Sequence, residues 1–248
     1  MAITERIRSI TKKEKQPPIF SAVILAAGNS TRMGQDKIEL SPGGIPVVVR
    51  AVRVFEESEL VSEIILVTRG DRIQELADQI KGYGFQKVKA VIAGGATRAE
   101  SSLAGVLATD KNAKLIGIHD CARPFVSQRV IRDTACAARD YYAALPVIPV
   151  TDTIKIKDGD FLGNLVDRET LCSIQTPQIF KADLIKGALT YVVKNNLPVT
   201  DDSSAVAYLG IKTRMVEGDR ENIKLTTPDD LVFAEAIIRH REEMEAKE

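Results

Sequence analysis

Short apolar runs alternate with segments of helical periodicity along much of the chain. The runs cover residues 22–25, 64–68, 88–92, 115–119 and 143–150. Between two of them, Ile73, Leu76, Ala77 and Ile80 repeat at the spacing of one helix face. Near-continuous apolar strands between helices are typical of a parallel sheet that is covered on both faces. We therefore predict a Rossmann-like α/β fold with a mostly parallel sheet, in which a ligand binds at the carboxyl ends of the strands.

The loop after the first apolar run has no bulky side chain before Arg32. It begins Ala26-Ala27-Gly28, and Lys37 follows shortly after it. Small residues let backbone N–H groups approach phosphate oxygens, and the arginine and lysine add fixed positive charge. The loop therefore indicates a nucleoside triphosphate, although it matches neither G-x-x-x-x-G-K-[ST] nor G-x-G-x-x-G. The alternative is a strand-to-helix turn that needs glycine for its geometry alone.

The charge balance and the cysteine count narrow the class of protein. Lys+Arg and Asp+Glu are both 34, whereas general binders of nucleic acid or membrane surfaces carry a basic excess. The three cysteines form no C-x-x-C and there are two histidines, which indicates a reducing compartment and no zinc site. No apolar run approaches the ~18 residues of a membrane span, so we expect a cytoplasmic protein. We expect residues 1–18, too charged for a signal peptide, to be a mobile tail and residues 19–248 to form a single domain.

Residues 151–175 break the alternation and suggest a β-hairpin arm. The stretch from Thr151 to Lys157 alternates with a period of two, Asp158-Gly159-Asp160 is a turn, and residues 161–171 could return. A lone hairpin is marginal in water, so it must fold back on the sheet or pack on another subunit. The second option makes a homodimer the natural hypothesis. If the arm does not pack on another subunit, its basic residues form a face that is exposed to solvent.

The last helix has a strong start in the sequence. We predict that Thr227 caps it, that Pro228 occupies its first position, and that Asp229 and Asp230 favour the positive end of its dipole. Further helices are predicted after Pro46 and over residues 182–194 and 203–209.

Polar and small residues follow the later strands in places that suit a ligand. Gly95 permits the close approach of a flat nucleotide base, and Ser101 could form hydrogen bonds to the edge of that base. The alternative is a glycine turn in which Ser or Thr caps the following helix. Asp120 ends a strand and suits Mg²⁺, a hard ion that takes oxygen ligands, unless it caps the next turn and pairs with Arg123. Lys224 lies between Ile223 and Leu225 and should point away from them; the alternative is an exposed surface lysine.

These motifs together are more specific than any one of them. In chain order they read A-A-G-x-x-x-R-M, G-G-x-x-R-x-x-S, H-D-x-A-R-P, V-D-R, Q-T-P-Q, T-D-D and E-N-I-K-x-T-x-P-x-D. The series closely resembles the 2-C-methyl-D-erythritol 4-phosphate cytidylyltransferases of the non-mevalonate isoprenoid pathway, from about Ala22 to the C-terminal helix. The resemblance implies a nucleotide-diphospho-sugar transferase-like fold with a protruding β-hairpin arm.

The resemblance also implies roles for residues of this chain. Ala26, Ala27, Gly28, Gly95 and Ser101 would line the cytidine and phosphate site. Arg32 and Lys37 would hold the triphosphate and the developing charge. Asp120 would assist Mg²⁺ and bind substrate, with Arg123 close by. Thr153, Arg168, Thr176 and Lys224 would hold the methylerythritol phosphate, and the two arm residues among them would serve the site of a neighbouring subunit.

The implied reaction transfers CMP from CTP to 2-C-methyl-D-erythritol 4-phosphate and releases pyrophosphate, with Mg²⁺ or another divalent cation. CTP and a polyol phosphate are the expected partners, with no nucleic acid and no membrane, and a homodimer forms through the arm. A ribitol 5-phosphate cytidylyltransferase, a sugar-1-phosphate nucleotidyltransferase and a non-catalytic nucleotide-binding regulator are the alternatives. The chain departs from the family pattern at Ala96, where an acidic residue is frequent, and in a short lid before Lys37.

Overall fold

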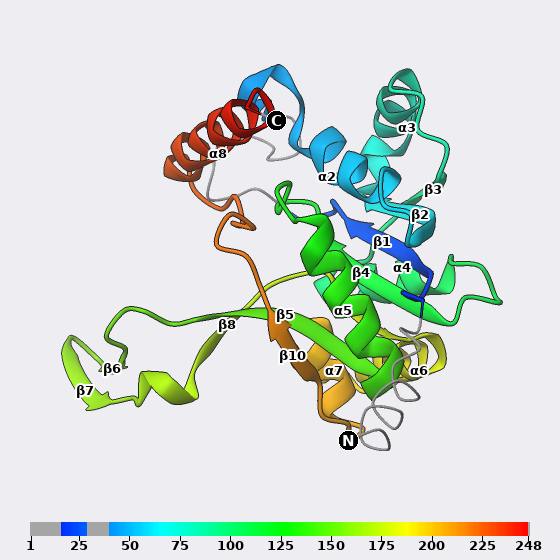
Figure 1. Cartoon of the computed structure of the whole chain (residues 1–248). Helices are drawn as coiled ribbons and strands as arrows, with labels where there is room; N and C mark the ends of the chain where they lie inside the picture. Colours follow the sequence, from blue (N-terminus) through cyan, green and yellow to red (C-terminus); the bar gives the residue numbers. More distant parts are fainter. Residues whose placement is uncertain (1–15, 29–39, 248) are drawn as a thin grey trace, which may run out of the picture.

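A mixed sheet forms the centre of the molecule. The computed structural model describes residues 16–28 and 40–247. The sheet has eight strands in the order β10-β5-β9-β4-β1-β2-β3, with β8 paired to β5 (Figure 1). Their bounds are β1 Phe20–Leu25, β2 Val61–Thr68, β3 Val88–Ala93, β4 Leu115–Asp120, β5 Ala143–Pro149, β8 Cys172–Ile174, β9 Gln178–Lys181 and β10 Arg214–Glu217. Strands β1 to β4 run parallel, while β9 is antiparallel to β4 and β5.

Helices cover both faces of this sheet, as predicted. They are α2 Val47–Glu56, α3 Ile73–Gly82, α4 Arg98–Leu107, α5 Gln128–Tyr141, α6 Ala182–Lys194, α7 Asp202–Ala207 and α8 Asp229–Glu245. Successive residues of β1 point to opposite faces, so Ala22 and Ile24 pack with α2 and α5 while Val23 packs with α4 and α6. The strands are therefore buried on both sides, which explains their near-continuous apolar sequence.

Several elements depart from the sequence prediction. Strands β8, β9 and β10 are short and were not predicted, nor was α5. The prediction that the Thr227 side chain caps α8 is wrong, because among the described residues no backbone N–H of this helix donates to it, although Pro228 has the helical φ and ψ expected of a first position. The Asp230 carboxylate instead accepts the backbone N–H groups of Thr226 and Thr227. No helix in the described part of the chain is long and apolar enough to cross a membrane.

The predicted arm is present and projects from the sheet (Figure 1). Strands β6 (Lys155–Asp158) and β7 (Phe161–Leu165) pair antiparallel around Gly159 in a two-stranded sheet of their own. The return strand is shorter than residues 161–171, because Arg168–Thr170 forms a 3-10 turn before β8 rejoins β5. The arm exposes large apolar side chains, which we call the arm patch: Ile156, Phe161, Leu162 and Leu165, from 55% to 80% exposed.

Candidate active site

The carboxyl ends of the parallel strands bring the predicted loops together at one edge of the sheet. Backbone N–H groups that follow β1, β3 and β4 each donate to the end of a neighbouring strand: Ala26 to Val67, Gly94 to Thr68 and Cys121 to Leu25. Leu25 and Asp120 are register partners. The loop of Ala26, Ala27 and Gly28, the loop of Gly95 and Ser101, and Asp120 therefore share this edge. Arg32, Lys37 and the short lid lie outside the described residues.

Close packing explains the glycine pair that follows β3. A Cβ on Gly94 would lie 2.6 Å from Ser101 Oγ and 2.9 Å from Ala27 Cβ, so only glycine lets the two loops meet. A Cβ on Gly95 would lie 2.3 Å from Glu100 Cβ. The Ser101 hydroxyl accepts the N–H of Gly95 and is itself buried. This close packing therefore determines the shape of the loop. The backbone of the same loop forms part of the edge at the carboxyl ends of the strands.

A capping box starts α4 directly after these glycines. Thr97 Oγ1 accepts the N–H of Glu100, and the Glu100 carboxylate accepts the N–H groups of Ala96 and Thr97. The loop is thus held without the acidic side chain that is frequent in the family at position 96.

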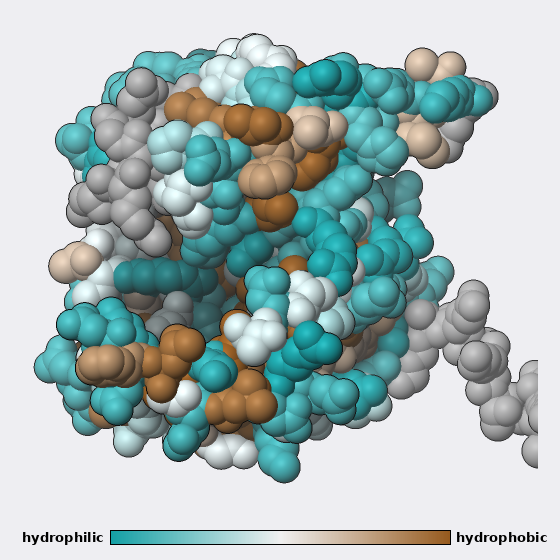
Figure 2. Space-filling model, turned by 90° about the vertical axis from the view of Figure 1, so that its left-hand side faces the viewer, coloured by the Kyte–Doolittle hydropathy of each residue, from teal (hydrophilic) through white to brown (hydrophobic). Residues whose placement is uncertain are grey.

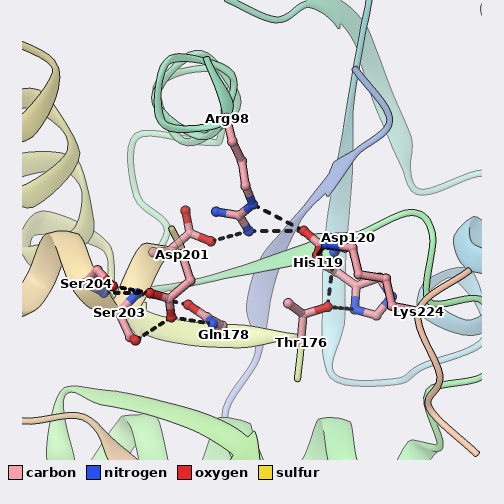
Figure 3. A network of polar contacts seen from close by, with 10 residues as sticks. Arg98, His119, Asp120, Thr176, Gln178, Asp201, Ser203, Ser204 and Lys224 are labelled. Atoms are coloured by element: carbon pink, nitrogen blue, oxygen red, sulfur yellow. Dashed lines mark hydrogen bonds and ion pairs between the residues drawn. The ribbon is translucent and has the colours of Figure 1, made fainter. Parts of the chain in front are cut away.

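Asp120 lies between two cations. Its Oδ1 is 3.1 Å from Arg98 Nη2, and its Oδ2 is 2.6 Å from Lys224 Nζ (Figure 3). Burial raises the pKa of the Asp120 carboxyl, but Arg98 and Lys224 outweigh that effect and hold it well below its usual range. The sequence prediction that Lys224 points away from Ile223 and Leu225 is confirmed. Asp120 pairs with Arg98 and Lys224, and no ion pair to Arg123 is formed by its carboxylate.

Arg98 also pairs with a fully buried carboxylate on α7. Its Nη2 is 2.8 Å from Asp202 Oδ2, and the Asp202 side chain is 0% exposed. The preceding Asp201 caps α7, and Gln178 on β9 donates to Asp201 and accepts from the N–H of Ser203. This network therefore connects α4, β4, β9 and α7 (Figure 3).

His119 is buried beneath the site and is held on both ring nitrogens. Nε2 lies 2.9 Å from the Arg123 carbonyl oxygen and Nδ1 lies 2.9 Å from Thr176 Oγ1. A carbonyl accepts only, so Nε2 carries the proton and Nδ1 accepts the Thr176 hydroxyl, which in turn accepts the N–H of Asp120. Burial lowers the pKa of His119 to about 4, so the ring is neutral at physiological pH.

The remaining predicted residues fall into two groups. Arg123 and Thr176 lie beside Asp120, but the Arg123 guanidinium donates to the carbonyls of Asn222 and Ile174 and so ties the Lys224 loop to β8. Thr153 and Arg168 are exposed on the arm, where Arg168 donates to the Thr151 carbonyl. Figure 1 shows that the arm extends away from the sheet.

Sequence reasoning assigned no role to Arg98, Asp202 or His119. All three stand inside quoted motifs, G-G-x-x-R-x-x-S, T-D-D and H-D-x-A-R-P, and these motifs were the signals available. Figure 2 shows that the face carrying the arm is hollowed and that mainly hydrophilic residues surround the hollow.

The donor set limits the kind of metal that this edge could hold. Among the described residues, no group of three or more His, Cys, Asp or Glu side chains could hold a metal ion. A single carboxylate suits Mg²⁺ when substrate phosphates supply the other oxygens, as in many nucleotide enzymes. Asp120 fits that arrangement and does not fit an all-protein metal cage.

Comparisons with known proteins agree on one family. The family profile of 2-C-methyl-D-erythritol 4-phosphate cytidylyltransferase matches residues 20–240. Curated proteins of that name from Caldanaerobacter subterraneus and Geobacillus thermodenitrificans are 40% and 41% identical to this chain. These alignments cover 88% and 90% of this chain and 98% of each relative.

Solved structures give the same result. The crystal structure of 4-diphosphocytidyl-2C-methyl-D-erythritol synthase from Anaerococcus prevotii superposes with a TM-score of 0.79 at 30% identity, over 90% of this chain and 97% of that one. The 2-C-methyl-D-erythritol 4-phosphate cytidylyltransferase from Thermus thermophilus gives 0.73 at 31% identity, over 89% of this chain and 100% of that one. The chain therefore belongs to the 2-C-methyl-D-erythritol 4-phosphate cytidylyltransferase family, whose members are nucleotidyltransferases of the non-mevalonate isoprenoid pathway.

Proposed function

We propose that this chain transfers CMP from CTP to 2-C-methyl-D-erythritol 4-phosphate at the edge of the sheet that carries Asp120. The observation that carries the proposal is the Asp120 carboxylate, ion-paired to Arg98 and Lys224 beside two loops of small residues. In this arrangement Ala26, Ala27, Gly28, Gly95 and the backbone near Ser101 contact cytidine and phosphates. Arg32 and Lys37 hold the triphosphate.

The chemistry joins two anions. A phosphate oxygen of the acceptor attacks the α-phosphorus of CTP, and the bond to pyrophosphate breaks. A phosphate monoester is already largely ionised at neutral pH, so catalysis is mainly positioning and charge neutralisation. His119 is buried and neutral, which agrees with a reaction that needs no histidine as acid or base. Removal of one cation aimed at the transition state typically costs about 3 kcal/mol, or roughly a hundredfold in rate.

Asp120 is the residue of this edge that would hold Mg²⁺ when phosphates are bound. Asp120 would hold the ion together with phosphate oxygens, and the bound ion would supply charge neutralisation for the leaving pyrophosphate. Both Asp120 oxygens are engaged in ion pairs, so the cation would replace Lys224, whose side chain is 42% exposed, before it replaces the more enclosed Arg98.

The acceptor phosphate requires its own cations. We propose that Lys224 turns from Asp120 to this phosphate, and that the partner subunit's Thr153 and the partner subunit's Arg168 complete the pocket from a swapped arm. Arg123 and Thr176 support the pocket by holding the Lys224 loop and the Asp120 backbone. The exposed arm patch supports a homodimer, because large apolar side chains on a lone hairpin gain stability when a second subunit covers them.

Mixed dimers test the shared site. The Arg168→Ala and Lys224→Ala variants are purified separately, mixed, allowed to exchange subunits and assayed for pyrophosphate release. If each arm serves the partner's site, a heterodimer holds one intact site, and a random mixture should regain about a quarter of wild-type activity. If each arm serves its own chain, every site in the mixture carries one defect and no activity returns, which would contradict the swapped arm. Exchange is verified separately, by recovery of untagged Lys224→Ala chains on affinity-tagged Arg168→Ala chains from the same mixture.

A further inference from the structure

Arg98 has the geometry of a residue that positions Asp120. It occupies the first turn of α4 and bridges two carboxylates, at 3.1 Å to Asp120 Oδ1 and 2.8 Å to Asp202 Oδ2 (Figure 3). We propose that Arg98, anchored by Asp202, fixes the orientation of the Asp120 carboxylate. The carboxylate then keeps this orientation when Lys224 moves away from it during turnover. The proposal rests on the proposed role of Asp120 in binding the acceptor substrate.

The anchor, Asp202, is buried. The Asp202 side chain is 0% exposed, and its Oδ1 has no hydrogen-bond partner in the described part of the chain. An ionised carboxylate in such a place needs its cation, because leaving it unpaired costs several times what an exposed pair is worth. Asp202 therefore holds Arg98 firmly on its side of the bridge.

The position of Asp202 is set from the sheet. Gln178 of β9 donates to Asp201 at 2.9 Å and accepts the N–H of Ser203 at 2.9 Å. The Asp201 side chain caps α7 through the N–H of Ser204. Since β9 pairs with β4, the strand that carries Asp120, the anchor and the carboxylate that it orients are tied to one sheet.

The two partners of Asp120 differ in their freedom. Arg98 is 30% exposed and is held from both sides, whereas Lys224 is 42% exposed and has Asp120 as its hydrogen-bond partner. An arginine fork can hold two carboxylates at once, while a lysine is a point charge on a flexible stem. Arg98 therefore holds Asp120 Oδ1 in place. Asp120 Oδ2 can exchange its contact with Lys224 for a contact with a substrate group.

Charge balance supports this division. The formal charges of the cluster sum to zero, with two carboxylates, Asp120 and Asp202, and two cations, Arg98 and Lys224. The cluster is therefore balanced in charge before a substrate binds. When Lys224 turns to the acceptor phosphate and leaves Oδ2 to the metal ion, Arg98 still pairs with Oδ1 and keeps Asp120 in place.

Steady-state kinetics of Arg98→Gln, Asp202→Asn and the double variant test the proposal. Misplacement of Asp120 by about 1 Å should lower kcat with the acceptor by roughly a hundredfold, because the reacting groups no longer meet in line. The dissociation constant of CTP, measured by isothermal titration, should stay within about twofold, since positioning acts on the acceptor side. Asp202→Asn should also lower kcat, and the double variant should be as slow as Arg98→Gln, because both changes act through one interaction.

The double variant separates positioning from folding. Arg98→Gln alone leaves Asp202 buried and unpaired and could lower stability, whereas Arg98→Gln with Asp202→Asn removes both charges. If activity returned in the double variant together with its melting temperature, Arg98 would be structural and the proposal would fail. A large loss of CTP affinity in Arg98→Gln would assign Arg98 to the nucleotide and also overturn it. Arg98→Lys, which keeps the charge but loses the fork, should recover only part of kcat.

Controls distinguish a failure of the inference about Arg98 from a failure of the proposed function. Arg129→Gln removes an arginine of α5 paired with Asp133 at 3.4 Å outside this cluster, and should leave kcat unchanged. If the wild-type protein releases no pyrophosphate with methylerythritol phosphate, the proposed function fails. If wild type is active and Arg98→Gln matches it, only the inference about Arg98 fails.

Discussion

Buried His119 should make the protein lose stability in mild acid. Burial lowers its pKa from 6.5 to about 4, so the folded protein binds fewer protons at this ring than the unfolded chain does. The stability that the neutral ring contributes is therefore fully present above the unfolded pKa and is lost as the pH falls from there toward the folded pKa. Integrating between these two values, the free energy of unfolding should fall by about 2 kcal/mol between about pH 7.5 and about pH 5.

The acidic groups of the site do not explain a loss in this range. Charge pairing holds the pKa of Asp120 below its ordinary 3.8, and hydrogen bonds from serines and Gln178 outweigh burial to lower that of Asp201, so their stabilisation is lost only in stronger acid. The window above about pH 5 therefore isolates the histidine.

Urea unfolding at a series of pH values, for wild type and His119→Gln, measures this effect. Glutamine does not titrate, so its curve should lack the slope, and the difference between the two proteins should grow as the pH rises. The substitution itself also changes the free energy of unfolding. This change cancels when only the slopes of the two curves against pH are compared. Parallel curves for the two proteins, or an NMR titration that places the His119 ring near its ordinary 6.5, would refute this reasoning.

Further predictions concern packing, capping and the arm. Gly105→Ala should destabilise by about 1–3 kcal/mol although alanine favours helices, because its Cβ would lie 2.3 Å from Val23 Cγ1, whereas Gly187→Ala, with open space around it, should be neutral or stabilising in thermal melts. Asp230→Ala should cost about 1 kcal/mol through loss of the α8 cap, and Asp229→Ala much less; equal costs would show that the cap is not what matters. Serine in place of the arm patch should raise the dimer dissociation constant in analytical ultracentrifugation without lowering the melting temperature of the dilute chain; an unchanged constant would remove the arm from the interface.

Local periodicity predicted the central strands and most of the helices. Residues 64–68 and 88–92 lie within β2 and β3, and residues 182–194 coincide with α6. These segments are long enough for a repeat to be visible. Strands β9 and β10 have four residues each, and their pairing to β4 and β5 is decided by tertiary contacts, so no local pattern could reveal them. The start of α8 was mispredicted because Thr227 and Asp230 can both cap and only the backbone path selects between them.

The site was predicted in its positions but not in its pairings. Strand ends and small residues predicted that Gly95 and Asp120 share one edge, where the structure places them, since the carboxyl ends of parallel strands converge. The pairing of Arg98 with Asp120 and Asp202 spans 22 and 104 residues of sequence and depends on how α4 and α7 pack. The predicted roles of Thr153 and Arg168 stay predictions, because they depend on a second subunit.

Pyrophosphate release from CTP tests the central claim most directly. Purified protein with Mg²⁺ and CTP is given 2-C-methyl-D-erythritol 4-phosphate or ribitol 5-phosphate, and release is followed in time, with Asp120→Asn as the inactive control. We expect release with the first acceptor and little with the second. Release with ribitol 5-phosphate alone, or CTP binding without release in either case, would contradict the proposed reaction.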